Sequence, residues 1–171
     1  MKIFDILKCK TVTRLHCYQT HRSQNLADHQ WGVAMWLMYI MQGRMAKHLH
    51  EAMIHALMHD VGEVAVGDIP SPTKRLMPDQ GVSIDIAEKK FIDRAFGPLP
   101  DIGDDADLVR VADLLDLMHY CLTERLLGNK TLEEVFARAD VYIEEIGASR
   151  STANPWIAEA VNKMNWEYYN A

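Results

Sequence analysis

The chain has 171 residues, a length that one hydrophobic core usually serves, so we expect a single domain spanning residues 1–171. Hydrophobic residues make up 49% and charged residues 25%, which excludes a disordered chain, and the net charge of -6 excludes the basic excess that binding of long nucleic acid requires. Small phosphorylated molecules remain possible partners, because a metal ion and one or two basic side chains can supply positive charge locally.

Apolar residues recur at steps of three and four through most of the chain, which is typical of amphipathic helices. The first predicted helix covers about residues 25–42, with Asn25 as its N-cap and Asp28 three residues further on. The second covers about residues 47–60. Its apolar face ends in Asp60, a carboxylate where an apolar residue is expected, and this mismatch points to a function.

The stretch from Asp68 to Gly81 holds three of the six prolines, and we expect it to form a loop. A third, amphipathic helix is predicted over about residues 84–96. A fourth, over about 106–127, is apolar on most sides and should run through the core, with Asp113 in its middle.

Two further helices are predicted towards the C-terminus. Thr131 and Glu134 have the spacing of a capping box for a fifth helix, and Asn154 followed by Pro155 is typical of the start of a sixth. Strand-like alternation is absent, so the sequence predicts an all-α bundle of about six helices.

The cysteines and the apolar segments indicate where the protein resides. Cys9, Cys17 and Cys121 are odd in number and form no C-x-x-C pair, which argues against a disulfide framework or a structural zinc site. Asp5 and Lys8 interrupt the N-terminal apolar stretch, and no later segment approaches the roughly 20 apolar residues of a membrane span. We therefore expect a cytoplasmic protein with no export signal and no membrane partner.

His59 and Asp60 are adjacent at the C-terminal end of the second predicted helix. Neighbouring side chains on a helix point about 100° apart, so both can reach one ion only near a helix end or a bend. Val61 and Gly62 provide that bend. A borderline divalent cation accepts imidazole nitrogen and carboxylate oxygen together, so the pair is half of a metal site.

Two acids on apolar surfaces strengthen this interpretation. A single histidine on an apolar face is more often a core or surface residue than a ligand. Asp60 and Asp113 are harder to explain in that way, because an uncompensated ionised carboxylate is too costly to bury. Each therefore calls for a metal, another cation or a helix cap.

These residues resemble the pattern of the HD-domain phosphohydrolases, in which a lone histidine precedes an adjacent His-Asp pair and a distant aspartate. Here the pattern consists of His29 in NLADHQWG, His59 and Asp60 in ALMHDVGE, and Asp113 in VRVADLLD. The match covers residues 14 to about 125 and looks like the 5′-deoxynucleotidase branch, with its short phage dATP triphosphohydrolases. The resemblance implies a single-domain HD-domain helical bundle in which these four residues hold a metal ion.

The resemblance also implies roles for two acids and three basic residues. Glu63, one turn past His59, corresponds to the acid that orients the attacking water, and Asp68 to a second carboxylate close to the substrate; solvated carboxylates are the alternative. Arg14 matches a substrate-binding arginine. Lys74 and Arg110 match basic residues that face the phosphates in the family. The alternative is that both are ordinary solvated surface residues.

The chemistry follows from general principles. A metal lowers the pKa of its bound water, a carboxylate takes the remaining proton, and cationic groups stabilise charge on the phosphoryl oxygens. Glu63 would serve as the base, and Lys74 with Arg110 would serve as the cationic groups. Two-metal relatives carry further histidines between the His-Asp pair and the last aspartate, and this chain has none from 60 to 118. One divalent ion is therefore expected, with Co, Mn and Zn as candidates.

The substrate is less closely defined. The chain departs from the bacterial pattern at Leu15, in place of a tryptophan near the deoxyribose, and at Gln24, in place of a usual glutamate. Leu15 and Cys17 are candidates for contact with the base and are equally plausible as core residues. Both related activities, on deoxynucleoside monophosphates and on dATP, release a deoxynucleoside, so we expect a deoxynucleotide substrate such as dAMP or dATP and leave the number of phosphates open.

Two other functions stay open at this point. One is a catalytically silent nucleotide-binding or regulatory module, which the presence of Glu63 disfavours. The other is a phosphodiesterase on a cyclic or dinucleotide substrate, which the missing histidines disfavour. Because small HD enzymes commonly pair through helices, we also expect a homo-oligomer.

Overall fold

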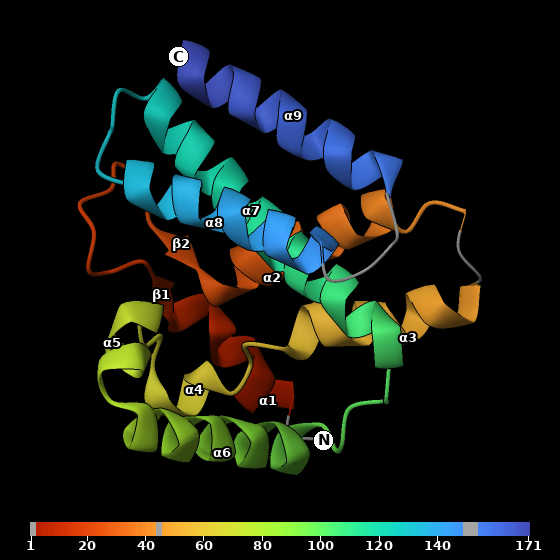
Figure 1. Ribbon diagram of the computed structural model, residues 1–171. Coiled ribbons are helices and arrows are strands. Elements are labelled where there is room, and N and C mark those ends of the chain that lie inside the picture. Colours follow the sequence, from red (N-terminus) through yellow and green to blue (C-terminus); the bar gives the residue numbers. More distant parts are fainter. Residues whose placement is uncertain (1–2, 44–45, 149–153) are drawn as a thin grey trace.

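The computed structural model describes residues 3–43, 46–148 and 154–171, and helices make up most of it (Figure 1). The six longest helices of the described residues are α2 (Leu26–Ile40), α3 (Ala46–Met58), α6 (Pro78–Ala95), α7 (Ala106–Leu126), α8 (Glu133–Ala148) and α9 (Pro155–Asn170). Shorter elements are α1 (Ile3–Ile6), α4 (Glu63–Val66), α5 (Ser71–Leu76) and the 3₁₀ helices η1 (Leu7–Thr11) and η2 (Gly103–Asp105). The all-α class is confirmed, and the helices outnumber the six that we expected.

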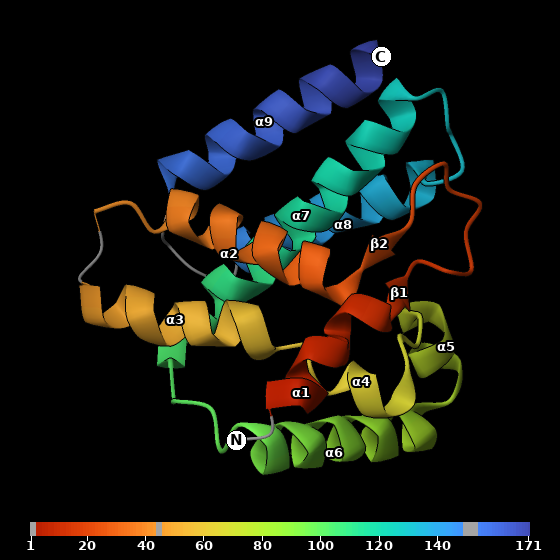
Figure 2. The ribbon, with the colours of Figure 1, turned by 180° about the vertical axis from the view of Figure 1, so that it is seen from behind.

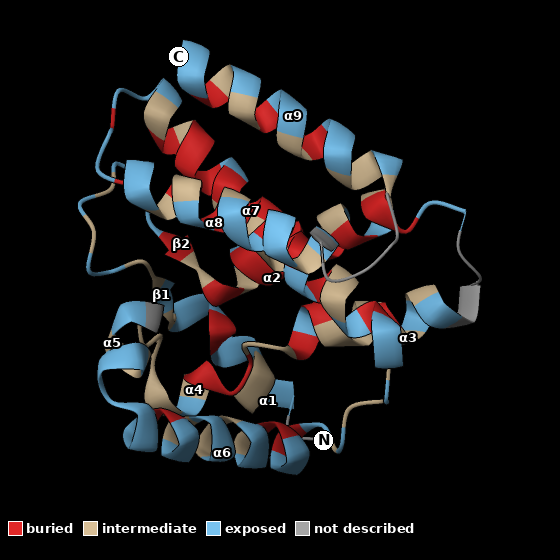
Figure 3. Cartoon of the chain, in the orientation of Figure 1, coloured by how far each residue is buried: buried red, intermediate tan, exposed pale blue. Residues whose placement is uncertain are grey.

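Helix α7 runs through the middle of the molecule, as its apolar surface predicts. It packs against α2, α3, α8 and α9, and the two opposite views show neighbours on its different sides (Figures 1 and 2). Its buried residues include Val111, Leu115 and Met118, and the burial colouring marks α2 and α7 as the most enclosed helices (Figure 3). Each large apolar side chain buried here contributes roughly 1.5–3 kcal/mol to folding.

A second, smaller apolar cluster lies where η1, the start of α2, the end of α3 and α6 meet. Its buried members are Cys9, Leu26, Met58, Val61 and Ile92. Helix α2 takes part in both clusters, because residues further along it belong to the main core. The first turns of α2 and the end of α3 therefore lie at the junction of the two clusters.

The predicted caps of α2 and α9 are present. The Asn25 side chain accepts a hydrogen bond from the Asp28 backbone N–H at 3.0 Å and donates one to the Asp28 carboxylate at 2.8 Å. Asn154 accepts a hydrogen bond from the Trp156 N–H at 3.0 Å. Helix α8 starts at Glu133, and the Thr131 hydroxyl donates to the backbone carbonyl of Gln19 at 2.8 Å.

The prediction of a loop over 68–81 was wrong, because α5 and the start of α6 lie within it. Pro72 occupies the second position of α5, and Pro78 the first position of α6. Proline is tolerated in the first turn of a helix, where no carbonyl within the helix needs its missing N–H. These prolines therefore mark the starts of helices.

A short antiparallel pair of strands precedes α2. Strand β1 (Thr13–Arg14) pairs with β2 (Gln24–Asn25), with Thr13 opposite Asn25 and Arg14 opposite Gln24. Two residues are too few to show a strand pattern in the sequence. The pairing holds Arg14 beside the start of α2. In the described part of the chain, no helix combines the length and the apolar character that crossing a bilayer needs.

Candidate functional site

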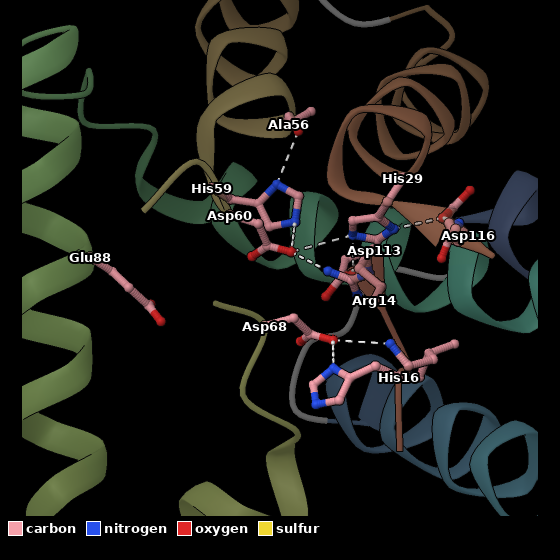
Figure 4. A network of polar contacts seen from close by, with 12 residues as sticks. Arg14, His16, His29, Ala56, His59, Asp60, Asp68, Glu88, Asp113 and Asp116 are labelled. Atoms are coloured by element: carbon pink, nitrogen blue, oxygen red, sulfur yellow. Dashed lines mark hydrogen bonds and ion pairs between the residues drawn. The ribbon is translucent and has the colours of Figure 1, made fainter. Parts of the chain in front are cut away.

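Four of the residues singled out from the sequence converge at the junction of the two apolar clusters (Figure 4). His29 comes from α2, His59 and Asp60 from the turn after α3, and Asp113 from α7. Ligand atoms of His29, His59 and Asp113 all lie within 4.8 Å of one another. Segments separated by more than eighty residues thus bring two imidazoles and two carboxylates together.

The spacing of these atoms suits a shared ion. His29 Nε2 lies 3.1 Å from Asp113 Oδ1 and 3.5 Å from Asp60 Oδ2, and His59 Nε2 lies 3.3 Å from Asp60 Oδ2. Two ligands at about 2.1 Å from one tetrahedral ion lie roughly 3.4 Å apart. The four side chains therefore lie at ligand-to-ligand distances without large rearrangement.

The end of α3 is what directs both members of the His-Asp pair to one place. The helix ends at Met58, and the chain continues through tighter turns, in which Val61 N–H donates to the Met58 carbonyl at 3.1 Å and Glu63 N–H to the Asp60 carbonyl at 3.0 Å. This change of winding at the helix end agrees with the bend predicted at Val61 and Gly62.

The hydrogen bonds of the two histidines fix their tautomers. His29 Nδ1 lies 2.7 Å from Asp116 Oδ2, and His59 Nδ1 lies 3.0 Å from the Ala56 carbonyl oxygen. Because a carboxylate and a carbonyl only accept, Nδ1 donates in both rings, so Nε2 is the atom that carries the lone pair when the ring is neutral. Both Nε2 atoms are buried and lack a hydrogen-bond partner among the described residues. Such nitrogens are suited to binding a metal ion.

The electrostatics of the cluster favour added positive charge. Burial disfavours the charged form of His59, but the Asp60 carboxylate outweighs it and, with Asp113, raises the pKa of His59 to about 9. Burial also opposes the charged form of Asp60, yet His59 and Arg14 hold the pKa of that carboxyl well below its usual range. A divalent cation would supply the positive charge that these carboxylates attract.

Glu63, the first residue of α4, has the properties of a base. It is buried, and its Oε2 atom has no hydrogen-bond partner among the described residues. Burial and the nearby Asp60 carboxylate raise the pKa of Glu63 to about 8, although Arg14 opposes the shift. A carboxylate whose pKa is near neutrality can accept a proton from water more readily than an ordinary glutamate.

Arg14 and Asp68 hold the segment after β1 beside the cluster. Arg14 Nη1 donates to Asp60 Oδ2 at 2.5 Å. Leu15 adopts a φ of 53°, a left-handed conformation that is unusual for leucine, and its N–H donates to Asp68 Oδ2 at 3.0 Å. His16 Nδ1 lies 3.7 Å from the same oxygen. The Asp68 carboxylate therefore supports a strained turn at the edge of the site.

A cavity of about 310 Å³ opens above the cluster, with Asp60, Glu63, Asp68 and Asp113 among its lining residues. Its volume is within the range of small-molecule sites. Of the proposed substrate-binding residues, the structure brings four to this cavity: Arg14, Leu15, Cys17 and Lys74. Lys74 lies on α5 and pairs with Glu88 of α6 at 3.2 Å.

Arg110 is the proposed substrate-binding residue that the structure does not bring to the cavity. It is exposed on α7 and is absent from the cavity lining. Arg75 of α5 and Arg138 of α8 line the cavity instead. No motif indicated them, because each has the pattern of a surface position on an amphipathic helix and only tertiary packing places it at the cavity.

Apolar and aromatic residues that the sequence analysis did not single out also line this cavity. They include Tyr18, Leu114, Leu117, Val135, Ala139 and Tyr142, and most of these six come from α7 and α8. Asp116, behind His29, was missed as well. Its only signal in the sequence was an acid one helical turn after Asp113 in an apolar helix.

Comparisons with known proteins agree with this geometry. Residues 6–139 match the family described as HD domain. The dATP triphosphohydrolase of Salmonella phage PMBT28 is 32% identical over 152 residues, which cover 82% of this chain and 77% of that protein. The 5′-deoxynucleotidase YfbR of Salmonella typhi is 27% identical over 157 residues, which cover 80% of this chain and 79% of that protein.

A solved structure is similar over the whole chain. It is the HD phosphohydrolase DatZ of Cyanophage S-2L, bound to dA and one catalytic Zn²⁺ ion. The TM-score is 0.76 at 16% sequence identity, and the alignment covers 100% of this chain and 98% of that one. At this identity the likeness shows a shared fold.

Proposed function

Because this chain belongs to the HD-domain family, we propose that it is a metal-dependent phosphohydrolase that converts a 2′-deoxynucleotide to the deoxynucleoside. One observation carries the proposal: two buried imidazole nitrogens, which have no hydrogen-bond partner in the part of the chain that the structure describes, face two carboxylates beneath a cavity that also contains Glu63. Relatives named for dATP and for deoxynucleotides supply the substrate class.

His29, His59, Asp60 and Asp113 would hold one divalent ion, with Co, Mn and Zn as candidates. When bound, the ion supplies Lewis-acid activation of water and of the phosphoryl oxygens. The Zn²⁺ ion bound by the structurally similar phage phosphohydrolase supports zinc.

The side chains of the cavity have separate roles in the proposed reaction. Glu63 accepts the proton of the attacking water, for which its raised pKa suits it. Arg14 stabilises negative charge on the phosphoryl oxygens from its place beside Asp60. Asp68 acts close to the substrate by holding the turn that contains Leu15.

The cavity contains complementary surfaces for the two parts of a nucleotide. Its apolar wall on α7 and α8, which includes Leu117 and Tyr142, suits a nucleobase and its sugar. Leu15 and Cys17 extend this wall from the segment after β1. A deoxyadenosine substrate is consistent with an apolar wall, and the phage relative is named for dATP.

The cations of the cavity bear on the number of phosphates. Arg14, Lys74, Arg75 and Arg138 all line it, in a protein whose net charge is -6. Four carboxylates line the same cavity, so a bound divalent ion would leave it with a net positive charge, which favours a strongly anionic ligand. We therefore favour dATP over dAMP, with triphosphate as the second product.

The proposal is tested by product analysis of the purified protein loaded with Mn²⁺, Co²⁺ or Zn²⁺. Incubation with dATP should give deoxyadenosine and triphosphate, separated by chromatography and identified by ³¹P NMR. Conversion of dAMP with no reaction of dATP would support the monophosphatase activity instead. Nucleotide binding measured by calorimetry, without any product from either substrate, would support the silent module and exclude the proposed enzyme.

We also propose that the protein forms a homo-oligomer. Several large apolar side chains are exposed, among them Trp31 at 65% and Trp166 at 68%. Light scattering coupled to size-exclusion chromatography tests this, and a mass of 19.5 kDa would show a monomer.

A further inference from the structure

The Asp116 carboxylate lies against the Nδ1 side of His29, opposite to the Nε2 side that faces Asp60 and Asp113 (Figure 4). We infer that Asp116 is a positioning residue that fixes the orientation and tautomer of His29, so that Nε2 is held ready to bind the metal ion. This inference rests on the proposed metal site. Neither the sequence motif nor the proposed mechanism includes Asp116.

The contact is short and enclosed. His29 Nδ1 lies 2.7 Å from Asp116 Oδ2, and the side chains are 0% and 8% exposed. Water therefore cannot readily take the place of the carboxylate. A carboxylate that accepts the second N–H of a metal-binding histidine fixes the ring and makes the other nitrogen a stronger ligand.

Gln24 holds Asp116 in turn. Its Nε2 atom donates to the same Oδ2 atom at 3.0 Å, from strand β2. An amide can donate to Asp116, whereas an ionised glutamate at this position could not. Two donors on separate elements therefore fix the Asp116 carboxylate.

Gly32 makes room for this arrangement. A Cβ atom at position 32 would lie 1.8 Å from Asp116 Oδ1 and 2.7 Å from Asp116 Cγ, so the Asp116 side chain would have to move. Glycine is unfavourable within a helix, yet it occurs here one turn after His29 on α2. The absence of a side chain at Gly32 allows α7 to bring Asp116 close to His29.

The other imidazole provides an internal contrast. His59 Nδ1 donates to the neutral backbone carbonyl of Ala56 at 3.0 Å, a contact that no side-chain substitution removes. His29 depends on an ionised side chain. Substitution of Asp116 should therefore weaken the metal site through His29 and leave the His59 contact in place.

The decisive variant is Asp116→Asn, which preserves the shape of the side chain and removes its charge. We expect its dissociation constant for Zn²⁺, measured by competition with a chromophoric chelator, to rise by roughly 10- to 100-fold. Turnover should fall at limiting Zn²⁺ and recover in part at saturating Zn²⁺. The free energy of unfolding in urea, measured in the presence of EDTA, should be close to that of the wild type. A merely structural role of Asp116 would instead lower this free energy.

Glycine substitutions supply a matched pair. Gly32→Ala should displace Asp116 and weaken Zn²⁺ binding in the same direction. Gly147→Ala, in helix α8, is the control, because a Cβ atom there meets no atom of the described residues within 4 Å. It should leave the dissociation constant unchanged.

The outcomes separate this inference from the proposed function. A wild type that binds Zn²⁺ and an Asp116→Asn protein that binds it within about twofold of the same affinity would overturn the inference alone. Weakened binding in Asp116→Asn, together with a wild type that hydrolyses no nucleotide, would support the inference and contradict the proposed function. A wild type that binds no divalent ion would overturn both.

Discussion

Helix α7 carries two acidic centres whose surroundings differ. Asp113 faces His29 and His59, whose Nε2 atoms have no hydrogen-bond partner in the described parts of the chain. Glu124 lies three turns later, about 16 Å along the helix. It is fully buried and accepts hydrogen bonds from the backbone N–H groups of His21 at 2.7 Å and Arg22 at 3.0 Å.

The Glu124 carboxylate also accepts from the Asn129 side chain at 2.8 Å, so fixed donors satisfy both of its oxygens. The centre at Asp113 instead places two imidazole Nε2 atoms, without a hydrogen-bond partner among the described residues, beside carboxylates. A buried acid whose oxygen atoms all accept hydrogen bonds stabilises the fold. Acids beside imidazole nitrogens that lack hydrogen-bond partners are instead suited to binding a cation. The two acids differ in the completeness of their hydrogen bonding as well as in burial, since the Asp113 side chain is 38% exposed and Glu124 is fully buried.

The largest effect should follow from Asp113→Ala. Removal of this carboxylate takes one ligand from the ion, so turnover should fall by roughly 10³-fold or more. Metal analysis by mass spectrometry should show loss of the bound ion, while urea unfolding with EDTA present stays close to the wild type. An Asp113→Ala protein that keeps one equivalent of metal and full turnover would contradict the assignment of Asp113 as a metal ligand.

Glu63→Gln should show whether proton transfer can be lost while metal binding is kept. The amide cannot accept a proton from water, so kcat should fall by about 10²- to 10⁴-fold with little change in KM. Bound metal, measured after desalting, should match that of the wild type. A kcat within a few-fold of the wild type would exclude Glu63 as the base.

Glu124→Ala should lower the stability of the protein and leave metal binding and turnover intact, the opposite of what is expected for Asp113→Ala. The Glu124 substitution removes the acceptor of the His21 and Arg22 backbone N–H groups and one of the two acceptors of the Asn129 side chain, and the free energy of unfolding in urea should fall by about 3 kcal/mol. Metal affinity and turnover of the folded protein should be unchanged. Glu124→Gln, which retains one acceptor oxygen, is the milder variant. Normal stability combined with lost metal binding would contradict a structural role.

The smallest effect is a pH dependence that belongs to Glu124. Burial disfavours its charge, but the hydrogen bonds from Asn129 and from the backbone of His21 and Arg22 outweigh burial and lower its pKa. A folded-state pKa below the unfolded value of about 4.3 gives stability that is present above that pH and lost as the pH falls through the folded pKa. With EDTA present, the stability difference between wild type and Glu124→Gln should therefore narrow on acidification. A difference independent of pH would contradict this assignment.

The sequence predicted the long helices well because their apolar periodicity and caps are local properties. Asn25 and Asn154 cap α2 and α9 in the structure, as their spacing indicated. The region around Pro72 was mistaken for a loop, because proline both ends helices and starts them, and the sequence alone does not say which. The strand pair containing Arg14 was too short to show a pattern.

In the candidate site, the sequence predicted the residues that belong to a motif and missed those that only helix packing brings to the cavity. His29 and Asp113 were identified through a motif, and the structure places them together. Arg138 and Tyr142 reach the cavity because α8 packs on α7, and nothing in their own helix pattern marks them. Arg110 has the spacing of a site residue, one turn before Asp113, yet its side chain is exposed outside the cavity lining.

The left-handed backbone of Leu15 has a consequence for protein engineering. A thermostabilisation programme would select this position early, because glycine or asparagine adopts a φ of 53° with less strain than leucine does. The more stable variant would also lose the Leu15 side chain from the lining of the cavity. At position 15, a substitution that raises thermal stability is therefore expected to reduce the selectivity of the cavity for its ligand.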